Sequence, residues 1–445
     1  MPDHAISTDP AVQAQLDRLW SLSPGADVLG LSRISALLAR LGDPHHHLPP
    51  VFHVAGTNGK GSTCAFLRAM LEADGKAVHV YSSPHLVRFN ERIRLAGRLI
   101  DDEALAPLLQ EVLDVGGDIG ASFFEVTTAA AFLAFSRTPA DACVIEVGLG
   151  GRLDATNVLT PIVAGVAGLG IDHEGFLLAP EPGVPEVPLA RIAFEKAGIA
   201  KPGVPLVTQS YPDVARHAIE AVADDRAALL CARGDTWDVE ARSDGLHYQD
   251  AFGPLHLHPP ALIGAHQIAN AGLAVAMIRH QRTVSVRHAA LSAGLQHAHW
   301  PARMQKLADG PLTRRLGTIP PGGVWLDGAH NDSAAAAIAA DWPRDASTSI
   351  VLGMLANKDA AGVVRHLVGM ARTVHLVAVP VPGHACHDPE ALADLARANG
   401  ATAGTADDIG SAFDLLAAHT PDRILVAGSL YLAGKVLEAN DELPA

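Results

Sequence analysis

The stretch HVAGTNGKGST (residues 53–63) joins an apolar strand pattern to a helical pattern. Its glycines permit a tight turn and a close backbone approach, while backbone N–H groups at a helix N-terminus and Lys60 offer positive charge to phosphate. It departs from the usual pattern GxxxxGK[ST], because Val54 stands at the first glycine and Gly61 follows the lysine. A plain Gly-Asn turn needs neither a lysine between two glycines nor the hydroxyls beyond it. We therefore predict a nucleotide-binding loop.

Outward from this loop, apolar runs of strand length alternate with helical patterns as far as the strand pattern PLVTQS. Such alternation predicts an α/β fold with a mostly parallel sheet and helices on both faces. Residues 227–259 alternate around a Ser-Asp-Gly turn, as a small antiparallel β appendage would. A helical pattern breaks at Trp300-Pro301, and a second α/β series follows, with two helices between the strand patterns TVHLVAVP and RILVAG. We expect a P-loop domain over residues 1–299 and a smaller Rossmann-like C-terminal domain over residues 300–445.

The composition narrows the class of protein. The chain has 33 basic and 48 acidic residues and a net charge of -15, the wrong sign for binding nucleic acid over a broad surface. The four cysteines show no metal or disulfide spacing, and the longest apolar run, IVAGVAGLGI, is too short to span a bilayer. We expect a cytoplasmic protein that binds neither nucleic acid nor membrane.

Acidic and histidine side chains follow two of the predicted strands. Glu146 ends the strand pattern ACVIE, and Asp172 and His173 follow the next strand. Ligands of α/β proteins collect at the carboxyl edge of the sheet, and Mg²⁺ prefers oxygen ligands. Glu146 is therefore a candidate ligand of the magnesium ion that a nucleotide-binding loop needs. For that residue alone, an ordinary acid at a strand end is an equal alternative.

A series of motifs makes a resemblance specific. In order along the chain they are GTNGKGS, YSSPHLVRFNERI, FFEVTTAAAF, VIEVGLGGRLDATN, LGIDHEG, EKAGI, GAHQIAN, WPARM, WLDGAHN and GSLYLAG. Between about Leu16 and Lys435 the sequence thereby resembles the folylpolyglutamate synthase family, which is related to the amino-acid-adding ligases of cell-wall synthesis. The GTNGK loop is similar to the nucleotide loop of that family.

The resemblance implies an ATP-dependent ligase. It would join L-glutamate to dihydropteroate, forming dihydrofolate, and to reduced folates, through an acyl-phosphate intermediate. Its partners would be these small-molecule substrates, and the protein would be a monomer. Alternatives are a cell-wall-type amide ligase, a folate polyglutamate synthase without dihydrofolate synthase activity, a P-loop switch or motor, and a catalytically silent binding protein.

The resemblance also implies roles for residues at the ATP site. Lys196 of EKAGI resembles the lysine that the family carbamylates, which helps to position a second metal ion. Lys60, Lys196 and His330 would act in catalysis, with His330 near the transferred phosphoryl group. The magnesium ligands would be Ser83, Glu146 and His173. The ATP contacts, some of them reaching across the domain cleft of the family, would be Gly56, Thr57, Asn58, Gly59, Lys60, Gly61, Ser62, Asn270, Arg303 and Asp327.

The first domain would also carry the pterin or folate site. The expected substrate contacts, including Ser429 for glutamate, are Leu29, Gly30, Ser122, Phe124, Leu153, Asp154, Ala155 and Ser429. Three positions depart from the family pattern: Val28 replaces an acid, Ser122 replaces a threonine, and Asn357 replaces the first acid of a DKD pattern. The segment 174–194 is longer than the family pattern, and the sequence assigns it no role.

Overall fold

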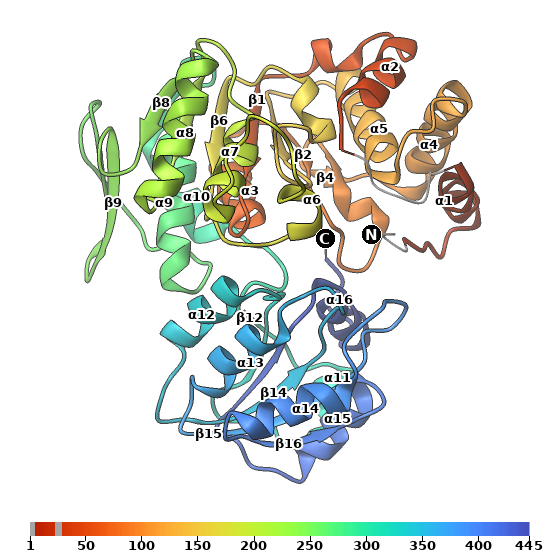
Figure 1. Cartoon of the computed structure of the whole chain (residues 1–445), viewed down its shortest axis with the longest axis vertical. Coiled ribbons are helices and arrows are strands. Elements are labelled where there is room, and N and C mark those ends of the chain that lie inside the picture. The colour runs from red at the N-terminus through yellow and green to blue at the C-terminus, as the bar shows by residue number, and fades with distance from the viewer. Residues whose placement is uncertain (1–4, 23–28, 445) are drawn as a thin grey trace. The chain divides into compact units, whose positions relative to one another are not determined.

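The computed structural model describes residues 5–22 and 29–444. The chain forms two compact units, and Figure 1 draws the first from red to green and the second from cyan to blue. The first unit comprises Met1–Ala261 and Gln267–His299, and the second comprises Leu262–His266 and Trp300–Ala445. Val28, one of the departures from the family pattern, lies outside the described residues.

An eight-stranded sheet with the order β4-β3-β2-β5-β1-β6-β7-β8 forms the centre of the first unit. The six neighbouring strands β2, β5, β1, β6, β7 and β8 pair in parallel. At one edge, β3 pairs in antiparallel fashion with β2 and β4. The mostly parallel sheet predicted from the sequence is confirmed. Its strands are β1 Val51–Ala55, β2 Val78–Tyr81, β3 Ile93–Leu95, β4 Arg98–Leu99, β5 Ala142–Glu146, β6 Val163–Val166, β7 Pro205–Thr208 and β8 Leu229–Ala232.

Helices cover both faces of this sheet. Every residue of the central strands β1, β5 and β6 is buried, so the largely apolar side chains on each face need a covering layer. Met277 of α9 packs on Gly165 of β6, and α3 packs on α10. The helices on this face are α3 Lys60–Ala73, α9 Ala265–His280 and α10 His288–His297. The opposite face carries α1 Pro10–Leu22, α2 Ser32–Arg40, α4 Asp102–Gly116, α5 Phe123–Arg137, α7 Pro188–Ala197 and α8 Asp213–Asp225.

The antiparallel appendage is present but shorter than predicted. It has the strand order β11-β10-β9, with β9 Trp237–Arg242, β10 Gly245–Asp250 and β11 Leu255–Leu257. The expected range began at residue 227, yet β8 pairs in parallel with β7 and belongs to the large sheet. The reason is that the apolar run Leu229–Ala232 continues the βα alternation before the hairpin begins.

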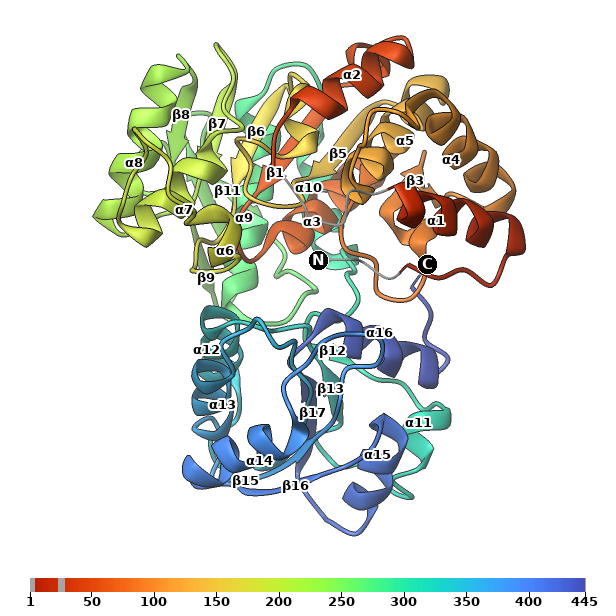
Figure 2. The ribbon, with the colours of Figure 1, turned by 45° about the vertical axis from the view of Figure 1, so that its right-hand side comes forward.

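The second unit has a six-stranded sheet with the order β12-β13-β17-β14-β15-β16, parallel except for β12. This is the smaller Rossmann-like fold that the sequence predicted. Figure 2 shows α12 and α13 on one side of the strands and α11, α15 and α16 on the other. The elements are β12 Gln305–Lys306, α11 Pro311–Arg314, β13 Val324–Leu326, α12 Asp332–Asp341, β14 Ser347–Leu352, α13 Ala360–Val368, β15 Thr373–Ala378, α14 Pro389–Ala398, β16 Thr402–Thr405, α15 Ile409–Ala417, β17 Arg423–Ala427 and α16 Leu430–Ala439.

One strand of this unit was missed. Two helices were predicted between β15 and β17, but β16 lies between them and pairs with β15. Its sequence, TAGT, is short and half exposed at the sheet edge, so it lacks the apolar run that identifies a buried strand. Within the described part of the chain, every helix is too short or too polar to cross a membrane.

Candidate active site

Four loops meet where the parallel strands of the first sheet end. β1 lies between β5 and β6, and β2 is the next strand beyond β5. Glu146, the last residue of β5, is the register partner of Val54 on β1. The backbone N–H of Ser83, just beyond β2, points to Oε2 of the buried Glu146 at 3.4 Å. Two of the three expected magnesium ligands therefore lie side by side next to the predicted nucleotide loop.

The loop after β1 has a backbone that requires glycine. Gly56 and Gly59 have φ values of 151° and 84°, which are unfavourable for residues with a Cβ. A Cβ on Gly59 would lie 2.3 Å from Oδ1 of Asn270. Asn270 of α9 is thus packed against the loop, as its expected role in nucleotide binding requires.

The same loop is fastened to the residues that follow β6. The N–H groups of Thr57 and Asn58 both donate to the carbonyl oxygen of Gly168, at 2.8 and 3.1 Å. The Thr57 hydroxyl donates to the Gly170 carbonyl at 2.9 Å. These bonds fix the loop in place beside the segment that continues to Asp172.

Lys60 and Ser62 begin helix α3 and provide the polar groups of the loop. Nζ of Lys60 donates to the carbonyl oxygen of Gly56 at 3.1 Å, so its charge lies directly over the loop. Ser62 is 1 % exposed, and its hydroxyl has no hydrogen-bond partner among the described residues. A buried hydroxyl without a partner is costly. A lysine and an unpaired hydroxyl at a helix N-terminus fit a phosphate group with its divalent cation.

Lys196, near the end of α7, reaches the same loop from the other side. Its side chain is 4 % exposed, and Nζ donates to the Gly56 carbonyl at 3.0 Å. Two lysines therefore converge on one carbonyl oxygen. Burial, reinforced by the positive charge of Lys60, lowers the pKa of Lys196 to about 7, although Asp172 and Asp154 oppose the shift. At neutral pH a large fraction of this amine is uncharged and nucleophilic.

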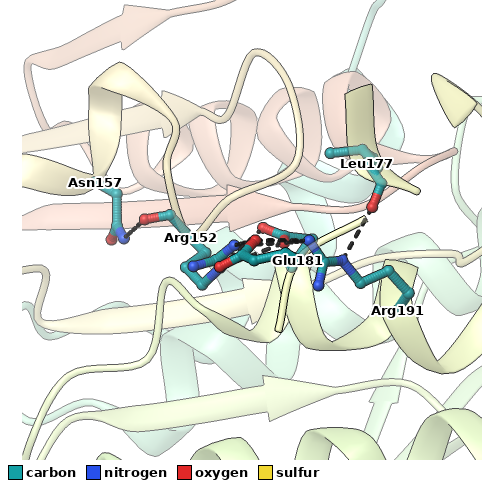
Figure 3. A network of polar contacts seen from close by, with 6 residues as sticks. Arg152, Asn157, Leu177, Glu181 and Arg191 are labelled. Atoms are coloured by element: carbon teal, nitrogen blue, oxygen red, sulfur yellow. Dashed lines mark hydrogen bonds and ion pairs between the residues drawn. The ribbon is translucent and has the colours of Figure 1, made fainter. Parts of the chain in front are cut away.

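A network of two arginines and two glutamates holds the helix that carries Lys196 (Figure 3). The Glu195 carboxylate forms ion pairs with the guanidinium groups of Arg152 and Arg191, with N–O distances of 2.9 and 3.2 Å. The Glu181 carboxylate pairs with the same two arginines at 2.6 and 2.8 Å. Arg191 and Glu195 are almost fully buried. Because buried charges are stable only when paired, this network fixes α7 and thereby the position of Lys196.

The sequence analysis did not identify this network. Arg191 and Glu195 are four residues apart on one helix, a spacing that indicates an ion pair. No comparable signal connects them to Arg152 or to Glu181, which lies in the long segment 174–194. The structure gives this segment a role, since Glu181 and the Leu177 carbonyl both receive hydrogen bonds from Arg191.

His173, the third expected magnesium ligand, follows β6 at the same edge. It has a left-handed φ of 53° and precedes the short helix α6 Glu174–Leu177, and its side chain is exposed. Its N–H donates to Oδ1 of Asp172 at 2.7 Å. Asp172 is close enough to raise the pKa of Lys196 by its negative charge, so this segment reaches the phosphate loop.

The expected pterin contacts gather around the N-terminus of α5. Ser122 caps this helix, its hydroxyl oxygen accepting the N–H of Glu125 at 3.3 Å. Phe124 covers Gly148 so closely that a Cβ there would lie 2.3 Å from Cζ of the ring. The segment of Leu29 and Gly30 leads into α2, where Nε of Arg33 donates to Glu125 at 2.9 Å. Sequence segments far apart thus meet at one place.

The loop after β5 supplies the remaining expected pterin contacts. The carboxylate of Asp154 accepts the N–H groups of Leu149 and Thr156 at 2.8 and 3.0 Å. Burial raises the pKa of this carboxyl group. Asp154 therefore shapes the loop internally, while its neighbour Leu153 is partly exposed and Ala155 is buried.

In the second unit, Asp327 organises the carboxyl ends of the strands. It follows β13 and accepts the N–H groups of Met304 and Ala329, each at 2.8 Å. A Cβ on Gly328 would lie 3.3 Å from Nη1 of Arg303. Arg303 is thereby held on the loop that Asp327 secures.

Two further expected site residues lie at this edge. Nδ1 of His330 contacts the Gly328 carbonyl at 2.8 Å. Ser429 follows β17, the neighbour of β13, and its hydroxyl oxygen accepts the N–H of Tyr431 at 3.1 Å. Arg303, Asp327, His330 and Ser429, which are distant in sequence, therefore share the carboxyl edge of the second sheet.

Most of the second unit matches a known protein family. Residues 320–439 match the model described as the dihydrofolate synthetase C-terminal domain. The family's fold in this region is thus recognisable from sequence alone.

Similarity to known proteins extends over nearly the whole chain. The Escherichia coli K12 protein named dihydrofolate synthase/folylpolyglutamate synthase is 34% identical over 418 residues, covering 93% of this chain and 92% of that protein. The solved structure of E. coli FolC in complex with DHPP and ADP superposes with a TM-score of 0.85 and 32% identity, covering 97% of both chains.

A second solved relative matches equally completely. The structure described as a bifunctional folylpolyglutamate synthase/dihydrofolate synthase with Mn, AMPPNP and L-glutamate bound has a TM-score of 0.82 and 30% identity. The match covers 97% of this chain and 99% of that one. Both units therefore have counterparts in the relatives.

Proposed function

The chain belongs to the family of dihydrofolate synthases and folylpolyglutamate synthases, and we propose that it joins L-glutamate both to dihydropteroate and to reduced folates. It is an ATP-dependent ligase. The observation that supports the chemistry best is the convergence of Lys60 and Lys196 on the Gly56 carbonyl of the phosphate loop.

The reaction must first activate a carboxylate, which is a poor electrophile at neutral pH. We propose that an oxygen of the pteroate or folate carboxylate attacks the γ-phosphorus of ATP, forming an acyl phosphate and releasing ADP. Lys60 neutralises negative charge that the phosphoryl group carries during transfer. The Ser62 hydroxyl and the first N–H groups of α3 bind and orient the phosphates.

A divalent ion fits this site, because relatives were solved with Mn bound and the residues at the strand ends offer oxygen and imidazole ligands. Ser83, Glu146 and His173 are the proposed ligands, and the ion supplies further charge neutralisation. Binding of a second ion is also proposed.

We propose that Lys196 is carbamylated. Its uncharged Nζ attacks the carbon of CO₂, an N–C bond forms, the electrons of one C=O bond move to oxygen, and the nitrogen releases one proton to solvent. The product is an anionic carbamate in place of a cation. Its charge would attract Lys60, and it would offer oxygen ligands to the second ion.

In the second step the amine of glutamate attacks the acyl carbon, phosphate leaves with the electrons of the broken C–O bond, and the nitrogen loses one proton, which the released phosphate takes up. His330 and Ser429 are proposed to act near the phosphoryl group and the glutamate, while Arg303, Asp327 and Asn270 are proposed nucleotide contacts. Ser122, Phe124, Leu153, Asp154 and Ala155, with Leu29 and Gly30, are the proposed pterin contacts. The cytoplasmic location and the monomeric state stay predictions.

The test is release of ADP by the purified chain with ATP and Mg²⁺. Separate reactions offer dihydropteroate, tetrahydrofolate or neither, each with and without L-glutamate, and product is followed by mass spectrometry. We expect both acceptors to give glutamylated product. Product from tetrahydrofolate alone would identify a folate polyglutamate synthase without the dihydrofolate synthase activity. ADP release without any acceptor would indicate a hydrolase and contradict the ligase proposal.

A further inference from the structure

The small three-stranded sheet has a polar face on which histidines of two strands are neighbours. Side chains alternate between the faces of a strand, and register partners lie on the same face. His247 of β10 pairs with His256 of β11 and, on its other side, with Glu240 of β9. The opposite face is apolar, and its buried residues are Trp237, Val239, Leu246, Tyr248 and Leu257.

Asp244 completes a cluster with these two histidines. It stands in the tight turn between β9 and β10, and its Oδ1 lies 2.9 Å from Nε2 of His247. Its Oδ2 lies 3.5 Å from Nε2 of His256. The two imidazole rings have centroids 4.8 Å apart, and one donor atom from each of the three residues lies within 4.8 Å of the others.

We propose that Asp244, His247 and His256 bind a divalent transition-metal ion of the Zn²⁺ class. Two imidazoles and a carboxylate are ligands that suit zinc, copper and nickel, whereas Mg²⁺ prefers oxygen alone. Ligand atoms about 2.0–2.2 Å from a tetrahedral zinc ion lie roughly 3.3–3.5 Å from one another. The observed separations are 2.9 Å from Oδ1 to His247 and 3.5 Å from Oδ2 to His256. They lie near this value, and side-chain rotation must bring one carboxylate oxygen and both nitrogens around a single ion.

The surroundings favour metal binding over a simple ion pair. Asp244 and His256 are exposed and His247 is partly exposed, so the ion can enter from solvent. With three protein ligands, a fourth position remains for water. The backbone of all three ligands is fixed in advance, because the hairpin register and the tight turn place them.

The bound ion joins the turn between β9 and β10 to the edge strand β11. A ligand that binds only the folded state stabilises that state. We therefore expect Zn²⁺ to stabilise the appendage. The site is separate from the phosphate loop and its proposed magnesium ligands, and the inference does not depend on the proposed function.

The experiment measures binding of Zn²⁺ to the full chain after removal of metals with a chelator. ZnCl₂ is titrated by equilibrium dialysis in excess MgCl₂, which competes with zinc for the proposed magnesium site, and bound zinc is counted by atomic absorption. We expect the wild-type chain to bind one zinc ion at this site. The zinc affinity of His256→Ala should be at least about tenfold weaker. His258→Ala, which removes an exposed histidine two residues away, is the matched control and should bind as the wild type does.

Asp244→Asn and His247→Gln provide independent tests if His256→Ala does not fold, since each removes one ligand with little change in volume. Circular dichroism checks that each variant is folded. A rise of the thermal midpoint with ZnCl₂ in the wild type, absent in these variants, would support the proposal. Equal zinc affinity in wild type, Asp244→Asn and His256→Ala would overturn it.

Discussion

The loop between β1 and α3 and the loop between β13 and α12 each join the carboxyl end of a strand to a helix, but their polar groups are paired in opposite ways. In the first, the Ser62 hydroxyl is buried without a partner among the described residues, and Lys60 lies over backbone carbonyls. In the second, Asp327 accepts two backbone N–H groups, and Asn331 caps α12 by accepting the N–H of Ala334 at 2.9 Å.

This difference separates a loop whose polar groups are left for a ligand from a loop whose polar groups also maintain its own shape. Polar groups left unpaired in a folded protein reduce stability but remain available to a ligand. Polar groups paired internally stabilise the loop and position its neighbours, as Asp327 does for Met304 and Ala329. Substitutions in the first loop should therefore affect catalysis more than stability, whereas substitution of Asp327 in the second loop should also lower stability.

Lys60→Ala should have the largest effect. The loss of a charge aimed at the transferring phosphoryl group is expected to lower the rate of ADP formation about 10²–10³-fold, with an unchanged thermal midpoint. Lys435→Ala, a surface lysine of α16 paired with Glu438, is the control. Activity of Lys60→Ala within a few fold of wild type would remove the distinction between the loops.

Lys196→Ala tests whether the second lysine of the loop acts through a carbamate. We expect a loss of about 100-fold, comparable to the loss of one electrostatic contact to the transition state, and partial recovery with added formate or acetate. Lys201→Ala is a matched control, because Lys201 also donates to a backbone carbonyl, that of Asn157, and burial lowers its pKa to about 8. Full activity of Lys196→Ala would exclude the carbamate.

The pH dependence of stability gives an independent test at Lys196. The pKa of Lys196 is about 7 in the folded state, whereas an ordinary lysine has a pKa of 10.5. Between these two pH values the unfolded chain therefore binds one proton more than the folded chain. The contribution of Lys196 to stability therefore rises with pH from 7 to about 10. The measurement is urea unfolding at pH 7 and pH 9 in CO₂-free buffer. We expect the unfolding free energy of the wild type to increase by a few kcal/mol between these pH values, and we expect this increase to be absent in Lys196→Met. The same rise in both proteins would show that Lys196 is not buried as an amine.

Asp327→Asn should destabilise the second loop. An amide has only one carbonyl oxygen, so either Met304 or Ala329 loses the acceptor of its buried N–H, at a cost of about 2 kcal/mol. The control is Asp359→Asn, since Asp359 caps α13 through one bond to the Gly362 N–H, which asparagine can also accept. Equal unfolding midpoints for the two variants would contradict the internal role of Asp327.

Ser62→Ala should have the smallest effect, and only on catalysis. Removing the unpaired hydroxyl leaves the unfolding free energy unchanged or slightly higher, while kcat falls about tenfold, because one contact worth about 1.4 kcal/mol is lost. Thr63→Val is the contrast, since the Thr63 hydroxyl donates to the Gly59 carbonyl and its loss should cost about 1 kcal/mol of stability. A clear loss of stability in Ser62→Ala would show that its hydroxyl is paired.

Buried elements were easier to predict than edges. The central strand β1 combines a buried apolar run with the glycine-rich turn that follows, and both signals lie within a few residues. β16 was missed and β8 was assigned to the appendage, because strands at a sheet edge are recognised by their pairing with β15 and β7 rather than by composition. The same holds for the candidate site. The glycine-rich loop identified Lys60, whereas no nearby sequence pattern indicated that Glu181 contacts Arg152 and Arg191.

The sequence by itself determined the α/β order, the phosphate loop and the family, because glycine torsions, apolar periodicity and ordered motifs are properties of short segments. Only the tertiary structure decided that Lys196 is buried against Gly56 with a lowered pKa, that Arg152 and Glu181 hold its helix, and that the Ser62 hydroxyl has no partner in the described part of the chain. The physical reason is that burial and charge pairing depend on groups that folding brings together from distant parts of the chain.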